Sequence, residues 1–506
     1  MSQKKAKARK QIPLIGIDSR FLSYLKPYGG LLFTSMLLIF TVAALDTLAP
    51  WPVKFIVDNV IGGKPFTGVA GEQILAALGD DQRVLTAALG IALLGVTVLQ
   101  GMAAFGIEYM NGMIQEKATF RLRSDVFGHA QRLPLEFYDQ SRLGDLVKRM
   151  TDDTGKIMVA LIRGLGELLL NTVKFANFAA VMLFINWRFS IIVLAYAPLL
   201  LFLFITFRRN IRAVAKTARD QEGQMNSLAL ETIGAIRVVK AFGREEYEQA
   251  RFDAHGEERV RAGLRAIRWE ASFGPVIDFI EAASTAAVIW YGVSQILVGN
   301  LSVGEMILFL SYLGSIYKPL KKFGALAGDL QKAAASGDRL SDLLDADVRI
   351  HESPEARALP RACGAVAFEN VGFAYATAAD QPVLQNFNLR VASGQVVALV
   401  GSTGAGKSTV ASVLMRLYDI TSGRILLDGL DVRDIRLNDL RRQFSLVPQE
   451  AVLFAASVRD NIAYGRPEAG EEEIIAAARA ANAEEFIRRL PKGYDTVVGE
   501  RGATLS

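Results

Sequence analysis

The sequence is poor in cysteine and histidine, and these two scarcities exclude whole classes of site. A single cysteine, Cys363, rules out an intramolecular disulfide framework and any zinc site built from several cysteines. The three histidines, His129, His255 and His351, lie far apart in the chain, which argues against a histidine metal cluster. Hydrophobic residues make up 51% of the 506, and this share is too large for an ordinary soluble protein. The 22% that are charged are too many for a protein lying wholly in a bilayer, so we expect a membrane part and a soluble part.

Long apolar runs predict six membrane-spanning helices. A helix needs about 20 apolar residues to cross roughly 30 Å of hydrocarbon. The predicted spans are residues 27–45, 84–107, 164–187, 189–207, 282–298 and 302–321. The last two form one apolar stretch, which the turn-forming pair Gly299 and Asn300 divides. The sequence therefore predicts an all-α membrane domain of six helices.

Lysine and arginine orient these spans. They are frequent in the N-terminal tail and in the two long connections at 108–156 and 208–270, and rare in the loop at 51–82. Because cytoplasmic loops carry the excess of positive charge, the tail, both connections and the region after the sixth span are predicted to be cytoplasmic. This accounts for the net charge of +5 without nucleic acid as a partner. We expect a multi-pass protein of the cell (inner) membrane with both termini in the cytoplasm.

Both long connections show helical periodicity with charged faces. Proline or glycine interrupts each of them, at residues 132–137 in the first and 240–245 in the second. The pattern predicts two helical hairpins that extend into the cytoplasm. Their tips either dock on a soluble partner or are simply solvated, and periodicity alone leaves both alternatives open.

Composition changes after the sixth span. Short β-type runs separated by glycine turns predict a soluble α/β domain, and they occupy residues 365–375, 386–391, 395–400, 424–429 and 444–449. The predicted organisation is a cytoplasmic tail at 1–27, a transmembrane domain at 28–325, a linker at 326–350 and the soluble domain at 351–506.

Charged residues inside or beside the predicted spans need an explanation, since a charge at the bilayer centre costs about 2.5 to 3.5 kcal/mol on insertion scales. They are Asp46, Glu167, Lys174, Asp278 and Glu281. They either line a polar substrate cavity, or lie near helix ends in water, or pair structurally with a lysine. The sequence leaves these alternatives open and identifies no substrate.

The sequence GSTGAGKST at residues 401–409 matches the phosphate-binding pattern G-x-x-x-x-G-K-[ST]. A predicted buried strand at 395–400 leads into it, and a helix with apolar periodicity leaves from it. Gly401, Gly404 and Gly406 permit backbone conformations closed to other residues and let amide N–H groups approach phosphate oxygens. A glycine-rich turn with an exposed lysine is the alternative, which the flanking strand and helix disfavour.

The side chains of this loop have distinct predicted roles. Lys407 would neutralise the β- and γ-phosphates, and Ser408 would place its hydroxyl on Mg²⁺. The predicted nucleotide-binding residues are Gly401, Ser402, Thr403, Gly404, Ala405, Gly406, Lys407, Ser408 and Thr409. ATP and Mg²⁺ are therefore the expected cofactors.

The six spans, the phosphate loop and SLVPQEAVLFAASVRDNIAYG at residues 445–465 together resemble an ATP-binding cassette exporter half-transporter. In that family one polypeptide joins a membrane domain to a nucleotide-binding domain, and the resemblance runs from about Leu22 to the last residue. It implies ATP-driven export of a hydrophobic or amphiphilic substrate, such as a drug, lipid or peptide. It also implies membrane lipid and a second half-transporter as partners, in a homodimer or heterodimer whose hairpin tips rest on the nucleotide-binding domains.

The resemblance assigns roles to two further residues. In the family an aromatic residue ahead of the phosphate loop stacks on adenine, and Tyr375 stands at the matching place. Gln449 matches the family's glutamine loop, whose glutamine contacts Mg²⁺ and the attacking water and senses the membrane domain. Taken alone, Tyr375 would be a packing residue and Gln449 part of a turn.

The last residues depart from the family pattern. VGERGATLS at 498–506 matches the lead into the family's signature motif, with Leu505 and Ser506 as its first two residues. The family's metal-binding aspartate, catalytic glutamate and switch histidine have no counterpart, and the three glutamates at 471–473 are predicted instead to form the acidic first turn of a helix. We therefore expect a C-terminally truncated transporter with an incomplete α/β domain that does not hydrolyse ATP as given. The alternative of a different class is a membrane-anchored nucleotide-binding or regulatory protein without transport.

Overall fold

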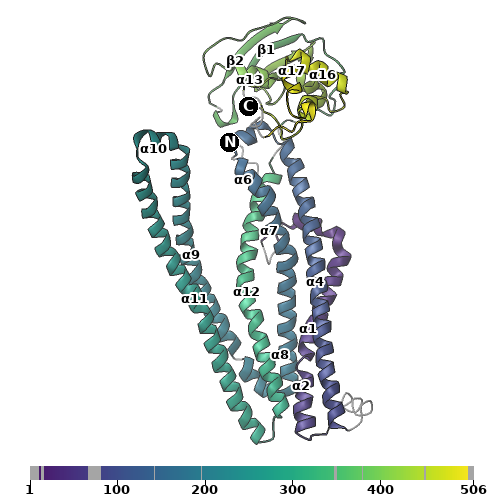
Figure 1. Ribbon diagram of the computed structural model, residues 1–506, viewed down its shortest axis with the longest axis vertical. Coiled ribbons are helices and arrows are strands. Elements are labelled where there is room, and N and C mark those ends of the chain that lie inside the picture. The colour runs from purple at the N-terminus through teal and green to yellow at the C-terminus, as the bar shows by residue number, and fades with distance from the viewer. Residues whose placement is uncertain are drawn as a thin grey trace. The chain divides into compact units, whose positions relative to one another are not determined.

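The chain divides into two compact units in the computed structural model (Figure 1). The structure describes residues 11–12, 16–65, 81–141, 143–194, 196–346, 350, 352–378, 380–449 and 452–499. The first unit contains Met1–Leu133 and Ser141–Asp347, and the second contains Pro134–Gln140 and Val348–Ser506. The short segment Pro134–Gln140 thus belongs to the second unit, although the chain on both sides of it belongs to the first.

The first unit is helical. Its elements are η1 (Ser19–Tyr28), α1 (Gly29–Leu48), α2 (Trp51–Phe55), η2 (Ile56–Ile61), α4 (Gln82–Arg132), α6 (Leu143–Lys148), η3 (Arg149–Asp153), α7 (Thr154–Val159), η4 (Ala160–Gly164), α8 (Leu165–Leu194), α9 (Tyr196–Gly234), α10 (Ile236–Phe242), α11 (Glu245–Leu297) and α12 (Val303–Leu344). Among the described residues, four helical runs are long and apolar enough to cross a membrane, namely Ser19–Ile61, Gln82–Arg132, Leu143–Ile191 and Glu245–Leu297.

The break between α11 and α12 confirms the turn predicted at Gly299, whose φ is 80°. Ser302 and Glu305 start α12 with a capping box, in which each side chain accepts a hydrogen bond from the other residue's backbone N–H. Helix α12 then continues without interruption to its last residue, so most of the predicted linker at 326–350 is part of this helix.

Side-chain packing holds the helices of the first unit in two groups. Helices α1, α4 and α8 pack together, α12 packs on α8, and α9 pairs with α11. Figure 1 shows α9 and α11 as a long hairpin with α10 at its tip. An aromatic cluster joins α8, α11 and α12, and at its centre the ring of Phe189 lies perpendicular to that of Phe309 at a centroid distance of 4.6 Å.

Two of the charged residues in the apolar helices pair with each other. Lys174 Nζ on α8 lies 2.5 Å from Asp46 Oδ2 on α1. Gln100 on α4 donates a hydrogen bond to Asp46 Oδ1 at 2.9 Å. Of the three alternatives for the charged residues, the structure therefore favours an ion pair with a structural role for Asp46 and Lys174. An unpaired charge in an apolar bundle would be costly.

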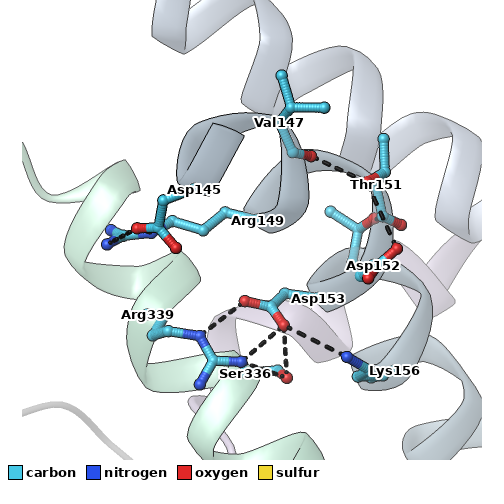
Figure 2. Close-up of polar contacts among 10 residues, drawn as sticks. Asp145, Val147, Arg149, Thr151, Asp152, Asp153, Lys156, Ser336 and Arg339 are labelled. Carbon is cyan, nitrogen blue, oxygen red and sulfur yellow. Dashed lines mark hydrogen bonds and ion pairs between the residues drawn. The ribbon is translucent and has the colours of Figure 1, made fainter. Parts of the chain in front are cut away.

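A second ion pair joins the π-helical segment η3 to α12, as Figure 2 shows. The carboxylate of Asp153 is 1% exposed as a side chain and accepts two hydrogen bonds from Arg339, at 2.7 and 2.9 Å. Ser336 Oγ donates to the same carboxylate at 2.8 Å, and Lys156 Nζ lies 4.0 Å away. Both oxygens of this buried carboxylate thus have hydrogen-bond partners, as a buried charge requires.

The second unit contains a small sheet and short helices. Its elements are α5 (Leu135–Gln140), β1 (Val366–Phe373), η5 (Ala376–Ala378), β2 (Leu384–Val391), α13 (Lys407–Leu414), β3 (Ser422–Leu427), β4 (Leu430–Asp431), η6 (Val432–Asp434), α14 (Leu437–Arg442), α15 (Val458–Ile462), η7 (Ala463–Gly465), α16 (Glu471–Ala480), α17 (Glu484–Arg488) and η8 (Gly493–Asp495). The strand order is β2-β1-β3-β4, and all three neighbouring pairs are antiparallel. Apolar residues of this sheet pack against α13, and a smaller core lies among α15, α16 and α17.

Two predicted strands of the α/β domain are not strands in the structure. Residues 395–400 and 444–449 have no regular secondary structure, and Val396 and Val447 are 95% and 94% exposed. A strand requires a neighbour that receives its hydrogen bonds, and in the described part of the chain the ladder pairs β1 with β2 and β3, and β3 with β4. The strands predicted at 395–400, leading into the phosphate loop, and at 444–449 are therefore wrong, and the sheet of the described residues is antiparallel.

Candidate functional site

The phosphate loop at 401–409 turns directly into α13. Gly406 is the N-cap residue of this helix, and its φ of 84° lies in the left-handed region that favours glycine. A Cβ at this position would lie 3.1 Å from side-chain carbons of both Leu384 and Val383, which leaves little room for any other residue. Gly404 also has a positive φ, of 86°. Glycine at these places sets the path by which the loop meets the helix N-terminus.

Lys407, the first residue of α13, folds back over the loop. Its Nζ donates hydrogen bonds to the carbonyl oxygens of Gly401, at 2.8 Å, and Ser402, at 2.7 Å. Residues 401–405 are exposed around it. The ammonium group and the N-terminus of α13 therefore place positive charge at the same exposed loop, which is an arrangement suited to an anion.

Tyr375 lies against the helix that follows the loop. Its hydroxyl is 3.0 Å from Oγ1 of Thr409 on α13, and Thr409 is buried. Its ring makes perpendicular contacts with Phe373, at a centroid distance of 4.9 Å, and with Tyr418, at 5.3 Å. The structure thus brings Tyr375 and Thr409 together, although they are 34 residues apart in the sequence.

Gln449 does not take part in these contacts among the described residues. Gln449 is exposed, and none of the hydrogen bonds among the described residues joins it to the phosphate loop. Leu505 and Ser506 lie outside the described residues. The glutamates at 471–473 form the first turn of α16, where Glu473 accepts the N–H of Gly470 at 3.1 Å, which confirms their predicted place.

The helix α5 contacts the same region through residues that no sequence motif indicates. The hydroxyl of Tyr418 donates to Asp139 Oδ2 on α5 at 2.7 Å. Burial raises the pKa of the Tyr418 phenol well above its ordinary value, and the hydrogen bond to Asp139 raises it further. The only sequence signal for this contact is the break at 132–137, where α4 ends and α5 begins.

Comparison with known proteins identifies relatives of both units. The family model of the ABC transporter transmembrane region matches residues 32–320, and that of the ABC transporter matches residues 384–506. An ATP-dependent lipid A-core flippase of Syntrophus aciditrophicus (strain SB) is 35% identical over 393 residues, which cover 78% of this chain and 65% of the relative. A lipid A-core flippase of Nitrosococcus oceani is 33% identical over 498 residues, covering 97% and 79%. A putative multidrug export ATP-binding/permease protein of Bacillus subtilis (strain 168) is 30% identical over 492 residues, covering 97% and 83%.

Proposed function

Because this chain belongs to the ABC transporter family, we propose that it is one half of an ATP-driven exporter of a hydrophobic or amphiphilic substrate. The observation that carries the proposal is the phosphate loop, where Gly406 turns the chain into α13 and Lys407 holds its charge over the exposed backbone. The names of the relatives support an amphiphile, since they refer to a lipid A-core flippase and to multidrug export.

ATP is the nucleotide of the proposal, and residues 401–409 fit its phosphates. The glycines leave no side chain over the loop, and Lys407 supplies a charge-assisted donor. ATP supplies the free energy of transport, while the residues of the loop bind and orient it. Tyr375 is assigned to the adenine base. Ser408 and Gln449 would hold Mg²⁺, and the side chains of both are exposed.

The membrane arrangement of the proposal has six spans, with both termini in the cytoplasm of a multi-pass inner-membrane protein. The four long apolar runs support it, and the capped break before α12 gives the last two spans separate ends. The proposed transmembrane domain, linker and nucleotide-binding domain keep the predicted limits of 28–325, 326–350 and 351–506.

A second half-transporter is the proposed partner. The tip of the α9–α11 hairpin exposes large apolar side chains, and Phe242 on α10 is 76% exposed. Others in the same segment are Leu230, Ile233 and Val238. An exposed apolar group of this kind marks an interaction surface, and the nucleotide-binding domain of the other half is the partner that the family suggests.

Reconstitution tests the proposal. The purified protein is placed in liposomes that contain a fluorescent phospholipid, and we expect Mg²⁺ and ATP to increase the amount of the lipid in the other leaflet. Lys407→Ala, which removes the charge at the phosphate loop, should abolish this increase. Binding of ATP with no movement of any amphiphile would contradict export and favour the alternative of a membrane-anchored nucleotide-binding or regulatory protein.

A further inference from the structure

Tyr418 links α5 to the phosphate-loop helix through a continuous series of contacts. Its hydroxyl donates to Asp139 on α5 at 2.7 Å, and its ring meets Tyr375 at a centroid distance of 5.3 Å with the ring planes at 87°. The hydroxyl of Tyr375 in turn lies 3.0 Å from Thr409 Oγ1 on α13. All four residues belong to the second unit.

The middle of this series is tightly packed. Tyr418 is 8% exposed, and its ring also contacts Phe373 of β1 at 5.7 Å. Phe373 is buried and lies perpendicular to Tyr375. Because side chains in a close-packed core cannot rotate without losing contacts, the orientation of the Tyr375 ring depends on where Tyr418 lies.

Asp139 is the exposed end of the series. Hydrogen bonds to an ionised acceptor are stronger than neutral ones, so Asp139 fixes the hydroxyl of a tyrosine whose ring is otherwise held by apolar contacts. The segment that carries it, Pro134–Gln140, has the first unit on both sides of it in sequence.

We propose that Tyr418 and Asp139 are positioning residues for the nucleotide base: docking of α5 on Tyr418 holds Tyr375 in the orientation that stacks on adenine. The inference rests on the proposed function, because it requires ATP at the phosphate loop. Neither residue touches the nucleotide itself. Since coupling between two binding events is reciprocal, a bound base also stabilises the docked position of α5.

The test compares a ligand that has a base with one that has none. Tyr418→Phe keeps the ring and removes the hydroxyl, and Asp139→Ala removes the acceptor at an exposed position. Each change should weaken ATP binding roughly 2- to 10-fold, the range that corresponds to one net hydrogen bond. Inorganic tripolyphosphate carries no base, so both variants should bind it as the wild type does. The double variant should lose no more ATP affinity than either single change, because both remove the same contact.

Tyr464→Phe is the matched control, since Tyr464 is an exposed tyrosine of the same unit whose ring stacks on Phe454. It should leave both affinities unchanged. Equal losses for ATP and tripolyphosphate, or losses that add in the double variant, would overturn the positioning role. If the wild type binds neither ligand, the proposed function itself fails. If Tyr418→Phe does not fold, Asp139→Ala still decides the matter, because Asp139 is on the surface.

Discussion

Lys407 is the residue on which nucleotide affinity should depend most. Its ammonium group is held over the loop by two carbonyl oxygens, and no backbone amide can replace its charge. We expect Lys407→Ala to weaken ATP binding by about 1.5 to 3 kcal/mol, the usual value of a hydrogen bond to a charged group. Titration with a fluorescent ATP analogue measures this. Lys492→Ala, at an exposed lysine of the same unit, is the control; equal affinity in the Lys407 variant and the wild type would refute the phosphate-binding role.

Gly406 should be as important for stability as Lys407 is for binding. Alanine at this position would have to adopt a φ of 84° and place its Cβ 3.1 Å from Leu384 and Val383. The left-handed conformation alone costs about 1 to 2 kcal/mol per residue, so Gly406→Ala should lower the unfolding free energy of the second unit by at least that amount. Urea unfolding checks the result against Gly465→Ala, where a Cβ meets nothing within 4 Å.

At the residue scale, the sequence predicts what is encoded locally. The spacing of glycines and lysine in residues 401–409 determines the backbone of one loop, and that loop is found where α13 begins. The contact of Tyr418 with Asp139 joins residues 279 positions apart. No pattern along the chain contains such a pair, because it depends on how α5 packs in three dimensions.

At the scale of elements, the apolar character of a short run predicts neither the pairing of a strand nor its burial. The run at 395–400 has the composition of a buried strand, yet Val396 and Val447 are almost fully exposed, because no described strand lies beside them. Helix ends were more predictable, since capping residues act on their own turn. The breaks at 132–137, 240–245 and 299–300 all coincide with helix ends. A helix makes its hydrogen bonds within one segment, whereas a strand needs a second segment.

The stabilisation that Tyr418 gives to the docked position of α5 should be lost at alkaline pH. Burial and the bond to Asp139 raise the pKa of Tyr418 above its ordinary value of 10.0. A raised pKa in the folded state means that the stabilisation is complete below about pH 10 and is lost as the pH rises through the raised pKa. The difference in unfolding free energy between wild type and Tyr418→Phe should therefore be constant from about pH 7 to 9 and shrink above 10. A difference that shrinks below pH 9 would contradict this assignment.

At the scale of the whole first unit, Asp153 should contribute more to the unfolding free energy than Asp145, which lies near it in Figure 2. Asp153→Asn removes the charge that Arg339 faces and should lower the unfolding free energy of this unit by about 1 to 3 kcal/mol, less than for a fully buried pair because Arg339 is partly exposed. Asp145→Asn breaks the exposed ion pair between Asp145 of α6 and Arg149 of η3, and should change the unfolding free energy by less than about 0.5 kcal/mol. Thermal unfolding in detergent compares the two, and equal losses would contradict the difference in burial.

The membership of Pro134–Gln140 in the second unit has a consequence for biosynthesis. The ribosome completes Asp139 long before Tyr418, which follows 279 residues later. At about 5 to 20 residues per second, that stretch takes roughly 14 to 56 s to translate. During this interval α5 has emerged without the surface that it binds. Slower elongation therefore lengthens the time for which this short segment is exposed to proteases. The helices of the first unit are also made before the rest of the second unit, to which α5 belongs.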